Sequence, residues 1–267
     1  MSAQLRHHIH LAGWGAATMV FAHGFGCDQT MWRHLAPAYQ HRYRVLTYDL
    51  IGSGGSDLSA YDPVRHGSLQ GHADDLLALI GAHAVGPVVF VGHSVGAMIG
   101  MLATIAAPER FVAQIMVSPS ACYINDGDYT GGFTRDDIDE LLETMETNFI
   151  AWSHSLVPTI MGAPNQPHLA SGLTASFCRN DPEIAHHFAS VTFRSDHRLD
   201  VPRSTTPALI LQCSDDLIAP STAGQWLHEN LPHSTLAMVS NVGHCPHMSA
   251  PTAVSAAIDA FLAQQLR

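Results

Sequence analysis

Short apolar runs alternate with longer amphipathic stretches through most of the chain. Six runs have the length and composition of buried β-strands: 18–22, 45–48, 87–91, 114–118, 208–213 and 235–239. Stretches between them, such as 73–80 and 97–103, have the apolar spacing of helices. Strands that alternate with helices are typical of a mostly parallel sheet covered by helices. The pattern therefore predicts an α/β fold.

The segment 123–195 departs from this alternation. It contains no convincing strand and four helical stretches, at 136–148, 149–161, 168–178 and 181–193. Asp181 followed by Pro182 is a typical helix start, with a capping side chain and proline at the first helical position. We expect core segments 1–122 and 196–267, with 123–195 inserted between the sixth and seventh strands as a helical lid.

The sequence Gly92-His93-Ser94-Val95-Gly96 joins the apolar run 87–91 to the helix that follows. A strand, a sharp turn and a helix are the context of a nucleophile elbow, in which glycines make room for a strained, exposed serine. The alternative is a glycine-rich turn with a passive serine. The elbow predicts Ser94 as a nucleophile.

A serine nucleophile needs a histidine base and an acid that orients it. His244 follows a glycine in the loop after the strand 235–239, and two adjacent carboxylates, Asp215 and Asp216, follow the strand 208–213. The order serine, aspartate, histidine is that of an α/β-hydrolase. We predict the triad Ser94, Asp216 and His244, with Asp215 as the alternative acid.

An oxyanion formed by attack on a carbonyl also needs hydrogen-bond donors. In this type of site one donor is the backbone N–H of the residue after the nucleophile, here Val95. The second comes from the loop after an early strand, where the sequence reads His23-Gly24-Phe25-Gly26. We predict the backbone N–H groups of Val95 and Phe25.

Composition narrows the choice of function. All 12 basic residues are arginine, so Schiff-base chemistry on lysine and a phosphate-binding loop with lysine are excluded. A net charge of −11 argues against nucleic acid or an anionic membrane as a partner. The five scattered cysteines are typical of reduced thiols in a cytoplasmic protein.

The 19 histidines form no recognisable metal motif, and we expect neither metal nor cofactor. His7, His8 and His10 are expected at the surface. The sequence has no evident targeting segment, and the weakly apolar stretch 85–107 fits the elbow better than a membrane span.

Several longer strings carry a family resemblance: 22–29, 52–58, 91–103, 122–126, 131–133, 211–213 and 243–249. Through them the chain resembles the RsbQ-like family of α/β-hydrolases, and more distantly the plant strigolactone and karrikin receptors. The resemblance implies the same triad and oxyanion donors under a four-helix lid. It also implies a small hydrophobic pocket at Phe25, Tyr123, Phe133, Trp152, Leu156 and Phe193, with Leu156 standing where the plant receptors carry an aromatic.

The leading hypothesis is a serine hydrolase that acts on a small apolar ester or lactone. The resemblance further implies stress signalling with a PAS-domain phosphatase as partner. Two alternatives remain: a slow-turnover receptor that signals through its lid, and a C–C bond hydrolase with the same triad. The sequence leaves open the natural substrate, the oligomeric state and whether the pocket is open or sealed.

Overall fold

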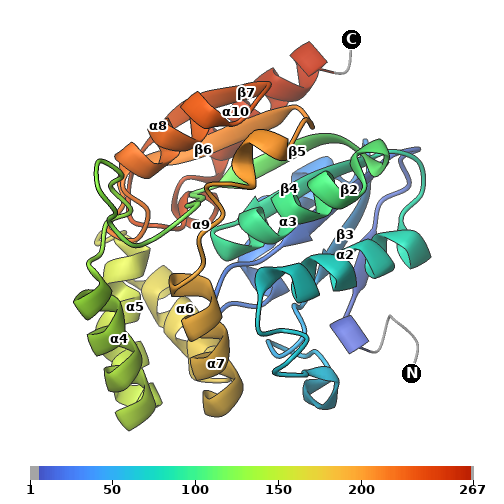
Figure 1. The fold of residues 1–267 in the computed structure, drawn as a ribbon. Helices are drawn as coiled ribbons and strands as arrows, with labels where there is room; N and C mark the ends of the chain where they lie inside the picture. Colours follow the sequence, from blue (N-terminus) through green and yellow to red (C-terminus); the bar gives the residue numbers. More distant parts are fainter. Residues whose placement is uncertain (1–5, 266–267) are drawn as a thin grey trace.

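A seven-stranded, mostly parallel sheet forms the centre of the molecule in a computed structural model that describes residues 6–265 (Figure 1). The strands are β1 (His10–Ala12), β2 (Thr18–Ala22), β3 (Arg44–Tyr48), β4 (Val88–His93), β5 (Phe111–Val117), β6 (Ala208–Asp215) and β7 (Ser234–Val242). Their order is β1-β3-β2-β4-β5-β6-β7, with β1 antiparallel to β3 and every other pair parallel. The predicted α/β class is confirmed.

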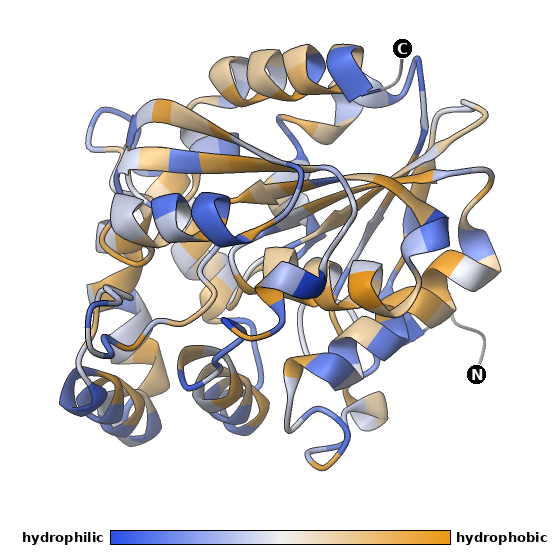
Figure 2. Ribbon diagram, turned by 45° about the horizontal axis from the view of Figure 1, so that its top comes forward, coloured by the Kyte–Doolittle hydropathy of each residue, from blue (hydrophilic) through white to orange (hydrophobic). Residues whose placement is uncertain are grey.

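Helices cover both faces of the sheet, as Figure 2 shows. One face packs against α2 (Leu69–His83), α3 (Val95–Ala106) and α8 (Ser221–Asn230), and the other against α10 (Pro251–Gln265). Successive residues of a strand enter opposite cores: Val20 faces the first group of helices, and Phe21 faces the second. Burial on both sides explains why the strands are continuous apolar runs.

Four consecutive helices lie between β5 and β6: α4 (Arg135–Thr147), α5 (Phe149–Met161), α6 (Pro167–Phe177) and α7 (Pro182–Phe193). We call these helices the helical insert; they gather at one end of the sheet (Figure 1). In the described part of the chain five strands precede the insert, and β1 is the one strand before β2. The insert therefore lies between the fifth and sixth strands, not between the sixth and seventh as expected. The predicted cap is confirmed, since Asp181 accepts hydrogen bonds from the N–H groups of Glu183 and Ile184.

Two glycines allow α3 to lie directly on the sheet. A methyl group added at Gly100 would lie 1.9 Å from the ring of Phe90 in β4, and one at Gly96 would lie 2.4 Å from the carbonyl oxygen of His23. The helix that begins just after Ser94 is therefore held tightly against β2 and β4. This packing fixes the position of the elbow.

Replacing Gly100 with alanine tests this packing. We expect the free energy of unfolding to fall by about 2 kcal/mol, because the new methyl group overpacks the contact with Phe90. Urea denaturation followed by circular dichroism measures the change. Gly172→Ala in α6 is the matched control, since its methyl group would meet nothing within 4 Å and should leave stability equal or higher. Equal effects of the two substitutions would contradict the argument.

Candidate active site

Ser94 occupies a strained turn between β4 and α3. Its φ of 54° and ψ of −123° lie in a region that residues with a side chain rarely adopt. Its N–H donates to the carbonyl of Val117 at 2.9 Å, and Gly92 and Gly96 leave no room for larger residues. The turn presents the hydroxyl at the carboxyl end of the parallel strands, where α/β sheets bind ligands.

His244 and Asp216 form a buried hydrogen-bonded pair. The Nδ1 of His244 lies 2.8 Å from Oδ2 of Asp216, while Oδ1 accepts from the N–H groups of Ile218 and Ala219. Burial by itself would raise the pKa of Asp216, but His244 and the two amides outweigh it and hold that pKa below its usual value. Nδ1–H of His244 therefore donates to a carboxylate, which leaves Nε2 free to accept a proton. The adjacent Asp215 is exposed to solvent.

The main chain of His244 is held as well as its ring. Its N–H donates to the carbonyl of Ile160, near the end of α5, at 2.8 Å. Its carbonyl accepts from Nε2 of His93, the residue before Ser94, also at 2.8 Å. The loop of His244 is thus hydrogen-bonded to the helical insert on one side and to the elbow on the other.

The predicted oxyanion donors lie next to the elbow. Val95 is the first residue of α3, so its N–H has no partner within the helix. The loop of Phe25 lies against the same turn, since a methyl group added at Gly24 would lie 3.3 Å from Cβ of Ser94. Both amides come from the two segments that border Ser94.

A small apolar cavity of about 30 Å³ lies over Ser94 and His244. Three of the predicted pocket residues, Phe25, Tyr123 and Phe193, line it. Sequence reasoning did not select the other lining residues, which include Ile160, Leu173, Phe177, Thr192 and Ile218. All of these except Thr192 are apolar, which was visible in the sequence but is equally typical of ordinary helix packing. The space suits about one water molecule, so the site is closed in this conformation.

The remaining predicted pocket residues lie elsewhere. Phe133, Trp152 and Leu156 line a separate groove of about 600 Å³ bordered by α4 and α5. Trp152 packs against Phe25 and Phe177, with ring centroids 6.4 and 6.2 Å apart. These rings, which meet edge-on or tilted, lie between the groove and the small cavity. A side chain such as Trp152 must move before the two spaces can join.

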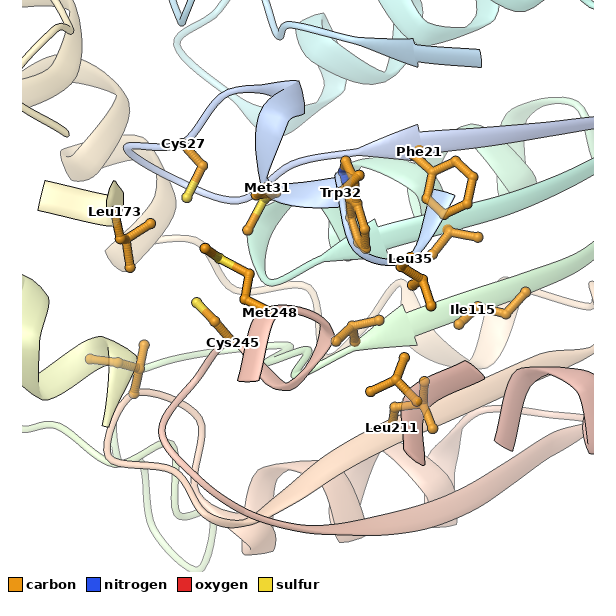
Figure 3. Close-up of a cluster of buried hydrophobic side chains, with 14 of the residues drawn as sticks. Phe21, Cys27, Met31, Trp32, Leu35, Ile115, Leu173, Leu211, Cys245 and Met248 are labelled. Carbon is orange, nitrogen blue, oxygen red and sulfur yellow. The ribbon is translucent and has the colours of Figure 1, made fainter. Parts of the chain in front are cut away.

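Four sulfur-containing side chains lie near one another in the core, as Figure 3 shows for Cys27, Met31, Cys245 and Met248. Cys27 and Cys245 also line the cavity. Burial raises the pKa of the Cys27 and Cys245 thiols, which keeps both protonated. Within the described residues all five cysteines are free thiols.

Comparison with known proteins places this geometry in a family. Residues 19–257 match the model of the alpha/beta hydrolase family. The chain belongs to the alpha/beta hydrolase family. This membership, with the parallel sheet, confirms the predicted α/β-hydrolase fold and family, and the plant receptors that the resemblance implied are among the relatives. The closer likeness to RsbQ stays a prediction from the sequence.

Several relatives match this α/β-hydrolase over nearly its whole length. It is 36% identical to the karrikin insensitive 2 receptor CA of Petunia hybrida, over 93% of this chain and 92% of the relative. It is 32% identical to the strigolactone esterase RMS3 of Pisum sativum, over 96% and 97%. A solved structure of a hydrolase from Oleispira antarctica superposes with a TM-score of 0.94 at 37% identity, covering 98% and 96% of the two chains.

Several histidines of this α/β-hydrolase are buried. Burial lowers the pKa of His72 and His93 to about 3, and that of His247 also lies well below its usual value. His7 is buried too, at 3% exposure, so the expectation of a surface position was wrong for it, while His8 and His10 are exposed. The side chain of His7 packs edge-on against Tyr48, a contact between segments far apart in the sequence.

Residues 6–265 lack two features that would suggest other functions. No group of three or more His, Cys, Asp or Glu side chains is arranged to hold a metal ion there. In the same residues, no helix combines the length and apolar character needed to cross a membrane.

The buried histidines make stability depend on pH. His72 takes up a proton near pH 6.5 when unfolded but only near pH 3 when folded, so the unfolded state binds more protons between these values. The free energy of unfolding should therefore fall as pH drops below 6.5, with His72 contributing about 2 kcal/mol by pH 5.

His72→Leu should flatten this dependence, because both ring nitrogens of His72 lack hydrogen-bond partners and the substitution removes the titrating group. Urea unfolding at pH 8 and pH 5 gives the difference for each variant. His41→Leu, at an exposed position, is the control and should retain the wild-type slope. A slope that is the same in both variants would refute the assignment.

Proposed function

We propose that this chain is a serine hydrolase that cleaves small, apolar carboxylic esters or lactones. Ser94 is the nucleophile, His244 the general base and Asp216 the residue that orients the base. The observation that carries the proposal is the buried contact of 2.8 Å between His244 and Asp216, beside the strained Ser94 and under an apolar cavity. The predicted enzyme class, an α/β-hydrolase of ester bonds, is confirmed by family membership together with the esterase among the relatives.

The proposed reaction has two halves, which are joined by an acyl-enzyme on Ser94. Ser94 Oγ attacks the substrate carbonyl as His244 Nε2 takes the hydroxyl proton, and Asp216 stabilises the imidazolium that results. The N–H groups of Phe25 and Val95 stabilise the oxyanion. Collapse of the tetrahedral intermediate expels the alcohol, which receives its proton from His244. Water then attacks the acyl group on Ser94 by the same route and releases the acid.

The cavity limits the substrates that this site accepts. Its walls are largely aromatic and aliphatic, and the described residues that line it include no Asp, Glu or Arg. A volume of about 30 Å³ is far below that of ordinary ligand pockets. Short acyl groups or small lactones therefore fit with the least rearrangement.

Ser94→Ala tests the mechanism. We expect kcat for p-nitrophenyl acetate to fall by roughly 10³-fold or more, because the nucleophile is lost while binding remains. Initial rates of p-nitrophenol release give kcat. Ser171→Ala, an exposed serine of α6, is the control and should keep wild-type activity. Retention of turnover by Ser94→Ala would rule out this mechanism.

A second candidate function is a ligand receptor with slow turnover. Two observations favour it: the closed cavity, and the hydrogen bond that ties His244 to Ile160 of the helical insert. A change at the triad can reach the insert through this bond. The insert would then act as a lid and signal to a protein partner. A PAS-domain phosphatase, stress signalling and a cytoplasmic location remain predictions from the sequence.

Hydrogen–deuterium exchange after labelling Ser94 with diisopropyl fluorophosphate tests the receptor. We expect amide protection in α5 and in the His244 loop to change together, because one main-chain bond joins them. Exchange in α2, which lies outside the insert, serves as the internal control. Unchanged protection in α5 on a fully labelled protein would count against signalling through the insert.

A further inference from the structure

The hydroxyl of Ser94 has an unexpected partner. The Oη of Tyr123 lies 3.3 Å from Ser94 Oγ, whereas Nε2 of His244 has no hydrogen-bond partner among the described residues. Tyr123 belongs to the loop between β5 and α4, and its side chain is 2% exposed. A tyrosine therefore contacts the reacting atom of the proposed nucleophile directly.

The position of Tyr123 is fixed from several directions. Its carbonyl accepts a hydrogen bond from the N–H of Phe133 at 3.1 Å, and Gly131 packs so closely that an added methyl group would lie 2.5 Å from its carbonyl carbon. Its ring meets that of Phe193 in α7 edge-on, with centroids 5.1 Å apart. The phenol is therefore held in place by the loop and by the insert.

The phenol of Tyr123 keeps its proton and is therefore able to donate a hydrogen bond to Ser94 Oγ. Burial is the main cause that raises the pKa of Tyr123 to about 12, so the group keeps its proton at any pH at which the protein works. Ser94 Oγ is its side-chain hydrogen-bond partner in the described structure. A donated hydrogen bond leaves the proton of the serine hydroxyl free to turn toward His244.

We propose that Tyr123 is a catalytic residue that donates a hydrogen bond to Ser94 Oγ and assists release of the serine when the acyl-enzyme is hydrolysed. The proposal rests on the function proposed above. In this step a water oxygen bonds to the acyl carbon, and His244 Nε2 takes the water proton. The bond from carbon to Oγ then breaks, its electron pair stays on Oγ, and His244 returns the proton to Oγ.

The effect of Tyr123 should differ between the two halves of the reaction. Before acylation, Oγ is a hydroxyl that already accepts the hydrogen bond, so little is gained on the way to the transition state. In the acyl-enzyme Oγ is an ester oxygen and a weak acceptor, and it gains negative charge as it leaves. A hydrogen bond that strengthens as negative charge develops on Oγ accelerates the step in which Oγ leaves. Tyr123 therefore acts mainly in deacylation.

Tyr123→Phe separates this role from simple packing, because it removes only the hydroxyl. With p-nitrophenyl acetate in a stopped-flow instrument, we expect the deacylation rate constant to fall about tenfold, the size of one lost charge-assisted hydrogen bond. The acylation rate constant should change by less than about threefold on the same grounds. Steady-state KM should fall with kcat, and intact-protein mass spectrometry should find more acetylated enzyme.

Tyr129→Phe is the matched control. Tyr129 lies in the same loop and is buried, but its hydroxyl donates to the carbonyl of Cys122 at 2.9 Å and not to Ser94. Loss of this hydroxyl should lower the melting temperature without changing the ratio of the two rate constants. The same altered ratio in both variants would show that loop packing, not the contact with Ser94, is responsible, and would overturn the proposal.

Two further results would also overturn it. These are equal losses in acylation and deacylation in Tyr123→Phe, and no change in either constant. Failure of the proposed function is a separate outcome, since Ser94→Ala would then retain turnover and no acetyl group would be found on Ser94. Failure of the Tyr123 proposal alone leaves turnover dependent on Ser94.

Discussion

The position of His244 is the constraint on which the rest of the site depends. The ring of His244 is hydrogen-bonded to Asp216, and its carbonyl accepts from the ring of His93. Its N–H donates to the carbonyl of Ile160. These partners come from the end of β6, the elbow and the helical insert, so three parts of the chain converge on one residue. A base must lie within hydrogen-bond reach of the proton it takes, and small displacements are costly. Fixing the main chain as well as the ring limits such displacement.

Two glycines make the contact between the insert and the loop of His244 possible. Gly162 and Gly243 both have positive φ, at 64° and 100°, and a methyl group on Gly162 would lie 2.6 Å from Cα of Gly243. The end of α5 and the loop of His244 therefore meet backbone to backbone. Movement of the insert relative to the sheet would therefore displace the main chain of His244. The insert and the loop of His244 are thus in direct backbone contact in this conformation.

Aromatic side chains of the insert cover the site at the end of the sheet. Phe177 and Phe193 line the small cavity, while Trp152 separates it from the groove beside α4 and α5. Exclusion of water lowers the local dielectric constant and strengthens the pairing of Asp216 with His244. The same packing leaves a space for about one water molecule and sets Tyr123 against Ser94. The packing of these aromatic side chains therefore both narrows the cavity and positions Tyr123 beside Ser94.

The sequence by itself determined the elements whose signals are local. Apolar runs gave the positions of the strands, Asp181 and Pro182 gave the start of α7, and the glycines around Ser94 gave the elbow, because each reflects a preference of the adjacent backbone. The four insert helices were predicted within a few residues of their bounds for the same reason.

Only the tertiary structure decided which side chains meet. The partner of Ser94, the lining by Phe177, the burial of His7 and the separation of Trp152 from the cavity all depend on segments distant in sequence. Whether Asp215 or Asp216 faces His244 depends on how the chain turns after β6. An apolar or polar pattern records that a residue is buried or exposed, but not what it touches, because contacts are set by how whole elements pack.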